Sequence, residues 1–346
     1  MGGKWYQLAA GVFEPTAAPG EVAVAALPWT VQARVSDLAA LDGRLYLAVN
    51  GHGLASLEPP QIAGSAPQIA ASAPGTAGPD FRYYYDPILF RYRTLTTLVP
   101  AAGSVICHLY FNSLLNVADA GELPIRGLGL LRLHPQDGIF QQIMMPFQIS
   151  HPGWECVGFV PVSDQEFLLE WKLAELERTR FEYTRYSLAA FRETPAERLE
   201  YRRAWEPQPS ERRLPADLQP LARELARRAE GRASAVFIGV RSSAEPLQRR
   251  YAHGEPGYGR EDAGRLLTAH AFRDGEGWLL LASDGLLLAS PTGGGSGALA
   301  ERHLPPLPAG FQYTDLFVLA GLLVAPWEQV DFILSGAAGI FISGEL

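Results

Sequence analysis

Four aspartates recur at turn-like places in this sequence and are the first candidates for chemistry. Two carboxylates that meet at one place can act as general acid and base, or can anchor a ligand. Aspartate also habitually accepts backbone N–H bonds in turns, which is a purely structural role. Recurrence favours the structural role, because every repeat needs its turn whereas catalysis needs only one or two carboxylates. The four residues are Asp37, Asp164, Asp284 and Asp315.

Aromatic residues and one histidine are candidates for binding. In the run Tyr83-Tyr84-Tyr85 neighbouring side chains of a strand face opposite ways, so one face is expected at an exposed rim. Tryptophans such as Trp154 could stack on sugars or peptides, although most large aromatics of a repeat fold pack between its units. Histidines from different repeats could also converge on a central channel. The candidate ligand-binding residues are therefore Tyr83, Tyr84, Tyr85, Trp154, Asp37, Asp315 and His270, and no catalytic residue is assigned.

Motifs for metal, cofactor or covalent chemistry are absent from the sequence. None of the seven histidines is paired at the i, i+2 or i, i+4 spacing of a linear zinc site. There is no calcium loop and no Gly-x-Ser-x-Gly elbow, and the glycine-rich stretch at 293–297 lacks the lysine of a phosphate loop. Cys107 and Cys156 are the only cysteines and lie in apolar runs, so buried free thiols are expected. No metal and no cofactor are predicted.

A repeated segment indicates which elements must position these residues. Near the N-terminus, Ser36-Asp37-Leu38 is followed by an apolar run and then by Gly43. Near the C-terminus, Thr314-Asp315-Leu316 leads through a similar run to Gly321. In both copies the aspartate precedes the glycine by six residues. Such a repeat indicates a supersecondary unit that cannot bury its apolar faces alone and must stack beside its copies.

Strand signals dominate the rest of the chain. Short apolar runs are bounded by Gly, Pro, Asp or Asn, and several Asp-Gly pairs mark tight hairpins. Units of about 40 to 55 residues with four strands are typical of β-propeller blades. The chain resembles the β-propeller repeat superfamily in architecture only, since the motifs of WD40, kelch and sialidase-type blades are absent. The resemblance implies an all-β fold of about six blades, with five or seven also compatible.

The two ends of the chain are predicted to close the ring. A strand signal from Trp5 to Val12 is expected to join the blade built from Phe311 to Phe341. Closure of this kind protects sheet edges that would otherwise aggregate. We therefore expect a single domain over residues 1–346.

Two segments interrupt the strand pattern. Residues 59–80 are rich in Pro, Ala and Gly, and are expected to form a mobile surface loop. Residues 206–232 are expected to be a helical insertion, with one external helix over 218–230. Asp217 is the expected N-cap of that helix, and its leucines are expected to pack on the outside of the ring.

Composition limits the classes of partner. The chain has 346 residues, 47% of them apolar, which is ample for a packed interior. Its formal net charge of −8 argues against nucleic-acid binding, because phosphate contacts need a basic surface. The Arg-rich sector at 172–250 could dock an acidic partner, but a solvated face with ion pairs is favoured.

The cellular location stays open. No stretch approaches 18 uninterrupted apolar residues, so no transmembrane segment is predicted. The N-terminus lacks the basic, apolar and small-residue zones of a signal peptide. An extracytoplasmic location would apply if an export signal had been removed from the chain.

These features favour a binding or scaffolding module that recognises a protein or a glycan without catalysis. The alternative is a carbohydrate- or ester-directed hydrolase or lyase with Asp and His at the central channel. A third interpretation is a structural subunit docked through the Arg-rich sector. Because the fold class does not determine the activity, all three remain open on the sequence alone.

Overall fold

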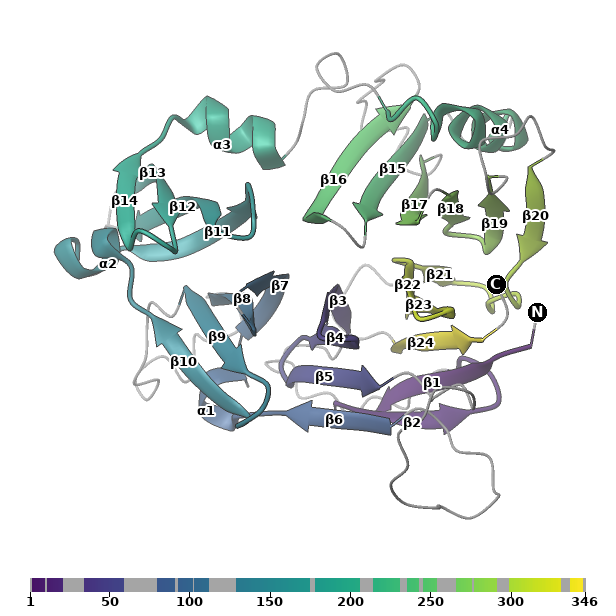
Figure 1. The fold of residues 1–346 in the computed structure, drawn as a ribbon, viewed down its shortest axis with the longest axis horizontal. Helices are drawn as coiled ribbons and strands as arrows, with labels where there is room; N and C mark the ends of the chain where they lie inside the picture. The colour runs from purple at the N-terminus through teal and green to yellow at the C-terminus, as the bar shows by residue number, and fades with distance from the viewer. Residues whose placement is uncertain are drawn as a thin grey trace.

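The structure is a computed structural model whose described residues form a mostly β protein with five sheets. Figure 1 shows these sheets following one another around a common centre. Five lies inside the expected range of blade numbers and below the expected value of about six. The structure describes residues 2–9, 11–20, 34–58, 80–90, 93–101, 103–111, 129–174, 178–205, 214–230, 235–242, 245–253, 266–275, 277–290, 299–330 and 337–344.

Three antiparallel sheets have four strands each, and their strands are neighbours in chain order. In each of them the first strand lies nearest the centre of the ring and the last lies at its periphery (Figure 1). Sheet 1 contains β3 (Val35–Leu41), β4 (Arg44–Val49), β5 (Gly53–Glu58) and β6 (Asp80–Tyr84). Sheet 2 contains β7 (Arg93–Ala101), β8 (Ser104–Phe111), β9 (Leu130–His134) and β10 (Ile139–Ile143). Sheet 3 contains β11 (Glu155–Pro161), β12 (Glu166–Ala174), β13 (Thr179–Ser187) and β14 (Arg192–Pro195).

The other two sheets have six strands each. Sheet 4 contains, in spatial order, β16 (Glu245–His253), β15 (Ala235–Ser242), β17 (Leu266–Asp274), β18 (Gly277–Ala282), β19 (Leu286–Ala289) and β20 (Ala300–His303). The pairing of β15 with β17 is parallel, whereas all other pairings in this sheet are antiparallel. Sheet 5 contains β21 (Phe311–Tyr313) and β22 (Phe317–Leu319), both paired with β23 (Leu322–Gln329), and then β24 (Ala338–Ser343), β1 (Lys4–Ala9) and β2 (Val12–Thr16).

The predicted pairing of the two chain ends is confirmed. Strand β1 runs antiparallel to β24, with Tyr6 opposite Ile340 and Trp5 opposite Phe341. The Trp5 and Phe341 rings pack with their centroids 4.8 Å apart. At Gly339 an added Cβ would lie 2.0 Å from the carbonyl oxygen of Tyr6, so this close approach of the two strands requires glycine. The signal from Trp5 onward contains two strands, β1 and β2, rather than one.

The repeated Asp–Gly segment forms the innermost hairpin of two sheets. Leu41 is opposite Arg44 in sheet 1, and Leu319 is opposite Leu322 in sheet 5, so each hairpin has a two-residue turn. Gly43 is the second turn residue in sheet 1 and has a φ of 73°. Two-residue hairpin turns favour positive φ, which explains the glycine of the repeat.

The register identifies equivalent places in the other sheets. In four sheets the equivalent residue lies six places before the second residue of the two-residue turn that joins the inner hairpin. In sheets 1 and 2 the same residue directly follows a one-residue irregularity in the inner strand. In sheet 3 that irregularity falls between Cys156 and Gly158. We call these the inner positions, and they are Asp37, Thr97, Gly158, His270 and Asp315.

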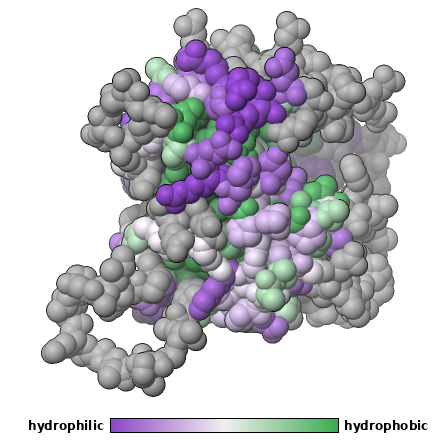
Figure 2. All heavy atoms as spheres, turned by 90° about the vertical axis from the view of Figure 1, so that its right-hand side faces the viewer, coloured by the Kyte–Doolittle hydropathy of each residue, from purple (hydrophilic) through white to green (hydrophobic). Residues whose placement is uncertain are grey.

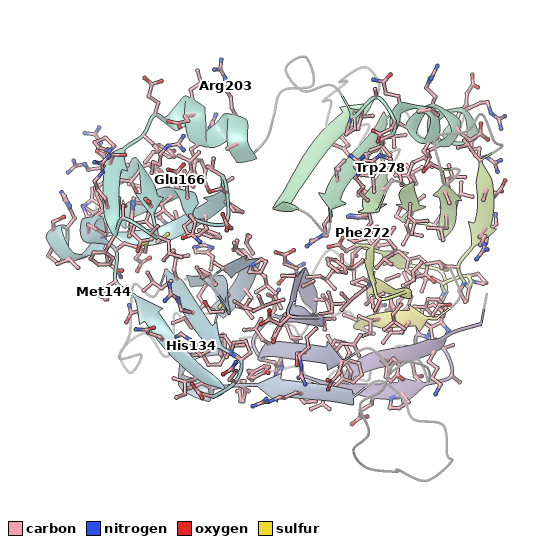
Figure 3. All side chains as sticks on the ribbon, in the orientation of Figure 1. His134, Met144, Glu166, Arg203, Phe272 and Trp278 are labelled. Carbon is pink, nitrogen blue, oxygen red and sulfur yellow. The ribbon has the colours of Figure 1, made fainter. Side chains whose placement is uncertain are left out.

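Apolar clusters join most neighbouring sheets. One cluster joins sheet 5 to sheets 1 and 4, a second joins sheets 1 and 2, and a third joins sheets 2 and 3. Figure 3 labels Phe272, which belongs to the first cluster and contacts Phe317 of sheet 5 with ring centroids 4.8 Å apart. Sheets 3 and 4 share no cluster among the described residues, because each packs against its own helix.

Four helices lie outside the sheets in the described part of the chain: α1 (Pro87–Phe90), α2 (Pro146–Ser150), α3 (Arg198–Trp205) and α4 (Gln219–Ala229). The predicted helix is confirmed as α4, whose Leu221 and Leu225 are buried against sheet 4. The predicted cap is wrong, because the N-cap is Leu218 without a side-chain bond and Asp217 instead lies 3.4 Å from Arg273. The other helices were not predicted because α1 and α2 have only four and five residues and α3 is mostly polar. Among the α3 side chains that the structure describes, Tyr201 alone is buried.

Two predicted segments lie largely outside the described residues. The predicted loop at 59–80 overlaps the described part only at its last residue, where β6 begins. Of the predicted insertion at 206–232, residues 214–230 are described.

Both cysteine thiols are buried and free, as expected. Burial raises the pKa of Cys107 to about 12 and also raises the pKa of Cys156, so neither is a thiolate at neutral pH. We expect a water-soluble maleimide to leave both thiols unmodified in the folded protein and to label both after unfolding in denaturant. Mass spectrometry after brief labelling measures this, and rapid labelling of the native chain at either residue would contradict the burial.

Candidate functional site

Arg241 joins the two aspartates of the repeated segment at the centre of the ring. Its Nη2 donates to Oδ1 of Asp37 at 2.6 Å and to Oδ2 of Asp315 at 3.0 Å. Its Nη1 donates to the carbonyl oxygen of Leu38. Arg241 comes from β15, Asp37 from β3 and Asp315 from the connection between β21 and β22. One guanidinium therefore ties sheets 1, 4 and 5 together.

The carboxylates of this cluster also hold backbone groups. The N–H of Leu38 donates to Asp37 Oδ1 at 2.9 Å, and the N–H of Leu98 donates to Oδ2 at 2.6 Å. The N–H of Leu316 donates to Asp315 Oδ1 at 2.8 Å. Both aspartates thus accept hydrogen bonds from the backbone of the inner strands, in addition to their ion pair with Arg241.

Burial dominates the electrostatics of the cluster. Asp37, Asp315 and Arg241 are 5%, 8% and 7% exposed. Burial raises the pKa of Asp37, and the Arg241 guanidinium opposes that shift. Burial alone would lower the pKa of Arg241, but the carboxylates of Asp315 and Asp37 raise it, so this cation stays charged. The arrangement is a buried ion cluster with its hydrogen-bonding capacity largely in use.

His270 occupies the inner position of sheet 4 and lies beside the cluster. Its Nδ1 is 3.7 Å from Asp315 Oδ1, and its side chain is 12% exposed. The structure therefore brings together three of the seven predicted site residues, His270, Asp37 and Asp315. Sequence reasoning missed Arg241, which was counted in the Arg-rich sector and assigned to a solvated face or a docking surface. A single arginine directly after the apolar run Val236–Val240 was the available signal for a buried cation.

The tyrosine run lies elsewhere, on β6 and just beyond it. Tyr84 is buried, whereas Tyr83 and Tyr85 are 37% and 49% exposed, an alternation typical of a strand. The Tyr83 hydroxyl accepts a hydrogen bond from the N–H of Phe13 at 2.9 Å, and its ring stacks with Phe81 at 6.3 Å. Tyr83 therefore helps to hold the outer strands of sheets 1 and 5 together.

Trp154 lies in a separate pocket on the peripheral side of sheet 3, which we call the α2 pocket. The cavity has a volume of about 530 Å³ between α2, the start of β11 and strands β13 and β14. Phe147 and His151 of α2 stack with centroids 4.1 Å apart, and Phe147 meets Trp154 edge-on at 5.7 Å. The Arg180 guanidinium lies 5.5 Å from the centre of the Trp154 ring. Aromatic surface and polar groups thus share one cavity.

Glu193 fixes the base of the α2 pocket. Its Oε2 accepts the N–H of Phe147 at 2.6 Å, and its Oε1 accepts the Trp171 indole N–H at 3.2 Å and the Thr184 hydroxyl. Burial raises the pKa of Glu193, and these hydrogen bonds oppose the shift. Since both oxygens already accept bonds, this carboxylate positions α2 against sheet 3.

His151 presents an exposed imidazole at the same pocket. Its Nδ1 lies 2.8 Å from the Ser150 hydroxyl and 3.2 Å from the carbonyl oxygen of Phe147. The other ring nitrogen, Nε2, donates or accepts according to the tautomer. Glu182 and Thr194 also line the pocket. Sequence reasoning found Trp154 but missed these neighbours, because β13 and β14 reach the site only through sheet pairing.

The remaining predicted features are minor. Asp284 accepts the N–H of Leu286 at 3.3 Å, which is the turn role expected of the recurrent aspartates. Within the described ranges, no group of three or more His, Cys, Asp and Glu residues could hold a metal ion. The helices of that part of the chain include none that is both long and apolar enough to cross a membrane.

Comparison with known proteins identifies a family. The model of DUF8086, described as a family of unknown function, matches residues 1–345. The chain belongs to this family. No curated protein matches it.

Two solved structures resemble the DUF8086 protein distantly. The polysaccharide lyase Uly1 has a TM-score of 0.29 at 8% identity, over 91% of this protein and 77% of the lyase. The complex of BT0996 with RGII has a TM-score of 0.29 at 9% identity, over 95% of this protein and 92% of BT0996.

Proposed function

We propose that this DUF8086 protein is a non-catalytic binding module, built as a five-bladed β-propeller, that holds a glycan in the α2 pocket. The architecture is supported by the equivalent inner positions of the five sheets and by the β1–β24 pairing. The expected blade number of about six thus becomes five. Strands β15 and β16 then extend the fourth blade instead of forming one of their own.

The observation that carries the proposal is the composition of the α2 pocket. Sugar rings present apolar C–H faces and rows of hydroxyl groups, which aromatic faces and polar side chains complement. Trp154 and Phe147 supply the first kind of surface, and His151, Arg180 and Thr194 supply the second. A volume of about 530 Å³ suits a small molecule or one end of an oligosaccharide. A concave cavity of this size favours a glycan over the flat surface of a protein partner.

The state of the central carboxylates supports binding over catalysis. An acid–base pair needs a carboxyl that can exchange a proton with a substrate. Asp37 and Asp315 are buried, share Arg241 and accept backbone N–H bonds. The meeting of these aspartates with His270 is what a hydrolase or lyase would require, so that alternative predicts cleavage of the bound oligosaccharide. Release of new reducing ends over time would establish it.

The ion pairs of the Arg-rich sector favour the interpretation that it is a solvated face over the interpretation that it docks an acidic partner. On α4, Arg228 Nε lies 2.6 Å from Glu224 and Arg228 Nη1 lies 2.6 Å from Glu301 of β20. Arg185 pairs with Glu166, labelled in Figure 3, at 3.2 Å, and with Glu200. Figure 2 shows hydrophilic side chains gathered over the upper part of the face that carries α4 and β20. Opposite charges thus offset much of this basic sector.

The W154A variant tests the proposed function. We expect an oligosaccharide found by screening an immobilised glycan panel to lose at least about tenfold in affinity, since the stacking surface and apolar area of the indole are removed from the pocket. Titration calorimetry measures the change. Phe191→Ala is the control for loss of an aromatic outside the pocket, because Phe191 follows β13 and is 57% exposed. Trp154 is only 8% exposed, so the titration is made at a temperature at which circular dichroism shows W154A to be folded. Unchanged binding in W154A, or a panel without any ligand, would refute the proposal.

A further inference from the structure

A second cavity lies beneath α3 and is lined by residues of α3, sheet 3 and sheet 2. In the described chain α3 covers the near face of sheet 3 and α4 covers that of sheet 4, as Figure 1 shows at the top of the ring. The cavity beneath α3 has a volume of about 590 Å³, within the range of small-molecule sites. It opens beside the inner strands β7 and β11. We call it the α3 pocket, and its lining includes Thr96, His108, Gly158, Glu170, Tyr201 and Arg202.

Gly158 makes room for Tyr201 in this pocket. Gly158 holds the inner position of sheet 3, where sheets 1 and 5 carry Asp37 and Asp315. A Cβ at Gly158 would lie 2.0 Å from the Tyr201 hydroxyl oxygen and 2.9 Å from the Glu170 Cβ. Burial raises the pKa of Tyr201, so its hydroxyl keeps its proton and can donate. At the inner position of sheet 3 a neutral donor takes the space that a carboxylate occupies in sheets 1 and 5.

His108 forms an uncharged part of the wall. Its Nδ1 lies 2.6 Å from the Thr96 hydroxyl, and its Nε2 lies 3.3 Å from the carbonyl oxygen of Cys156. Because that carbonyl can only accept, Nε2 carries the proton and Nδ1 accepts from Thr96. Burial lowers the pKa of His108 to about 4, against the opposing bond to Cys156. The ring is therefore neutral at pH 7 and adds no charge to the pocket.

The charge of the pocket comes from its rim. Arg202 of α3 is exposed and forms no salt bridge with the described residues, and the adjacent Arg203, labelled in Figure 3, also lines the cavity. The one carboxylate of the lining, Glu170, already accepts the Tyr183 hydroxyl at 2.8 Å. The cation offered to a ligand is Arg202, whose planar guanidinium fork fits carboxylate and phosphate oxygens.

We infer that the α3 pocket binds a small organic anion, a carboxylate or phosphate ester about the size of one or two sugar rings. Arg202 pairs with the anionic group, and the Tyr201 hydroxyl donates to an oxygen of the ligand. The site is separate from the α2 pocket, since the lining residues of the two cavities do not overlap. Sheet 3 then carries a ligand site on each of its faces.

Titration calorimetry with four probes tests this inference on the full chain. The probes are inorganic phosphate, glucose 6-phosphate, glucuronate and glucose. We expect at least one of the two sugar anions to bind and glucose not to bind, and the identity of the binding anion distinguishes phosphate from carboxylate recognition. Binding is expected to weaken with added salt because the rim of the pocket is exposed.

Two variants separate the site from general surface charge. Arg202→Ala is expected to lower the affinity by at least about tenfold through loss of a charge-assisted pair. Arg198→Ala, on the same helix and outside the cavity lining, is the matched control and is expected to leave affinity unchanged. Tyr201→Phe keeps the ring and removes only the donor, so a smaller loss is expected without a folding defect.

Three results would overturn the inference: no binding of any anion, equal binding of glucose, or equal losses in R202A and R198A. Because W154A does not touch this cavity, it should leave anion binding intact. A failure of the α2 pocket proposal can therefore be told apart from a failure of this one.

Discussion

The R241M variant should be less stable than the natural chain by about 3–5 kcal/mol, because it leaves two buried carboxylates without their cation. Asp37 and Asp315 are both under a tenth exposed and share this one guanidinium. A loss of that size is a large part of the about 5–15 kcal/mol that holds a typical domain folded. Denaturant unfolding at pH 7, followed by tryptophan fluorescence, measures the difference.

The pH dependence separates buried charge from lost packing. Without Arg241 the folded-state pKa of Asp37 rises further above its unfolded value of about 3.9. A carboxyl with a raised folded pKa penalises the folded state above that pKa, and the penalty fades as the pH falls toward the unfolded value. The stability gap between R241M and the natural chain should therefore narrow from pH 7 to about pH 4.

A control keeps this result specific to the central cluster. Arg223→Met removes an exposed arginine of α4 and should change stability by less than about 0.5 kcal/mol. If the difference in unfolding free energy between R241M and the natural chain did not change with pH, lost packing rather than unpaired carboxylates would cause the instability. A loss no larger than that of R223M would show that the cluster does not hold the three sheets together.

The W5A variant should lose about 3–5 kcal/mol, as expected for removing a buried aromatic side chain. Trp5 is 8% exposed and packs on Tyr313, Trp327 and Phe341, all near the other end of the chain. Its removal leaves a cavity between β1 and the C-terminal strands, at the place where the two ends of the chain pair. Val12→Ala on β2 is the control, because Val12 is 44% exposed. A loss in W5A as small as in V12A would mean that the N-terminal strand is not part of the closed sheet.

The sequence was most informative where the signal was local. The six-residue interval from Asp37 to Gly43 corresponds to the first strand and the turn of one inner hairpin. The interval is the same in both copies because the strand has a fixed length and ends in a turn that favours positive φ. The same interval after Asp315 made the C-terminal copy visible. Pairing of β1 with β24 followed from the need to protect two free edges.

Non-local contacts could not be predicted. Arg241 meets Asp37 across 204 residues of sequence, and no local pattern specifies such a partner. The α2 pocket depends on the position of β13 and β14 in sheet 3 relative to α2, so its polar residues have no common spacing in the sequence. Helix α3 was missed because, among its described side chains, Tyr201 alone is buried and gives no apolar period.

A glycan held as we propose contacts the α2 pocket and leaves the carboxylates in the middle of the ring untouched. Two-dimensional NMR of the chain, during titration with an oligosaccharide found by the glycan screen, tests this most directly. We expect shifts of the Trp154 indole N–H and of the amides of His151 and Thr194, with the amides of Leu38 and Leu316 unmoved. Shifts confined to Leu38, Leu316 and His270 would contradict the proposal and would place the ligand at the central carboxylates.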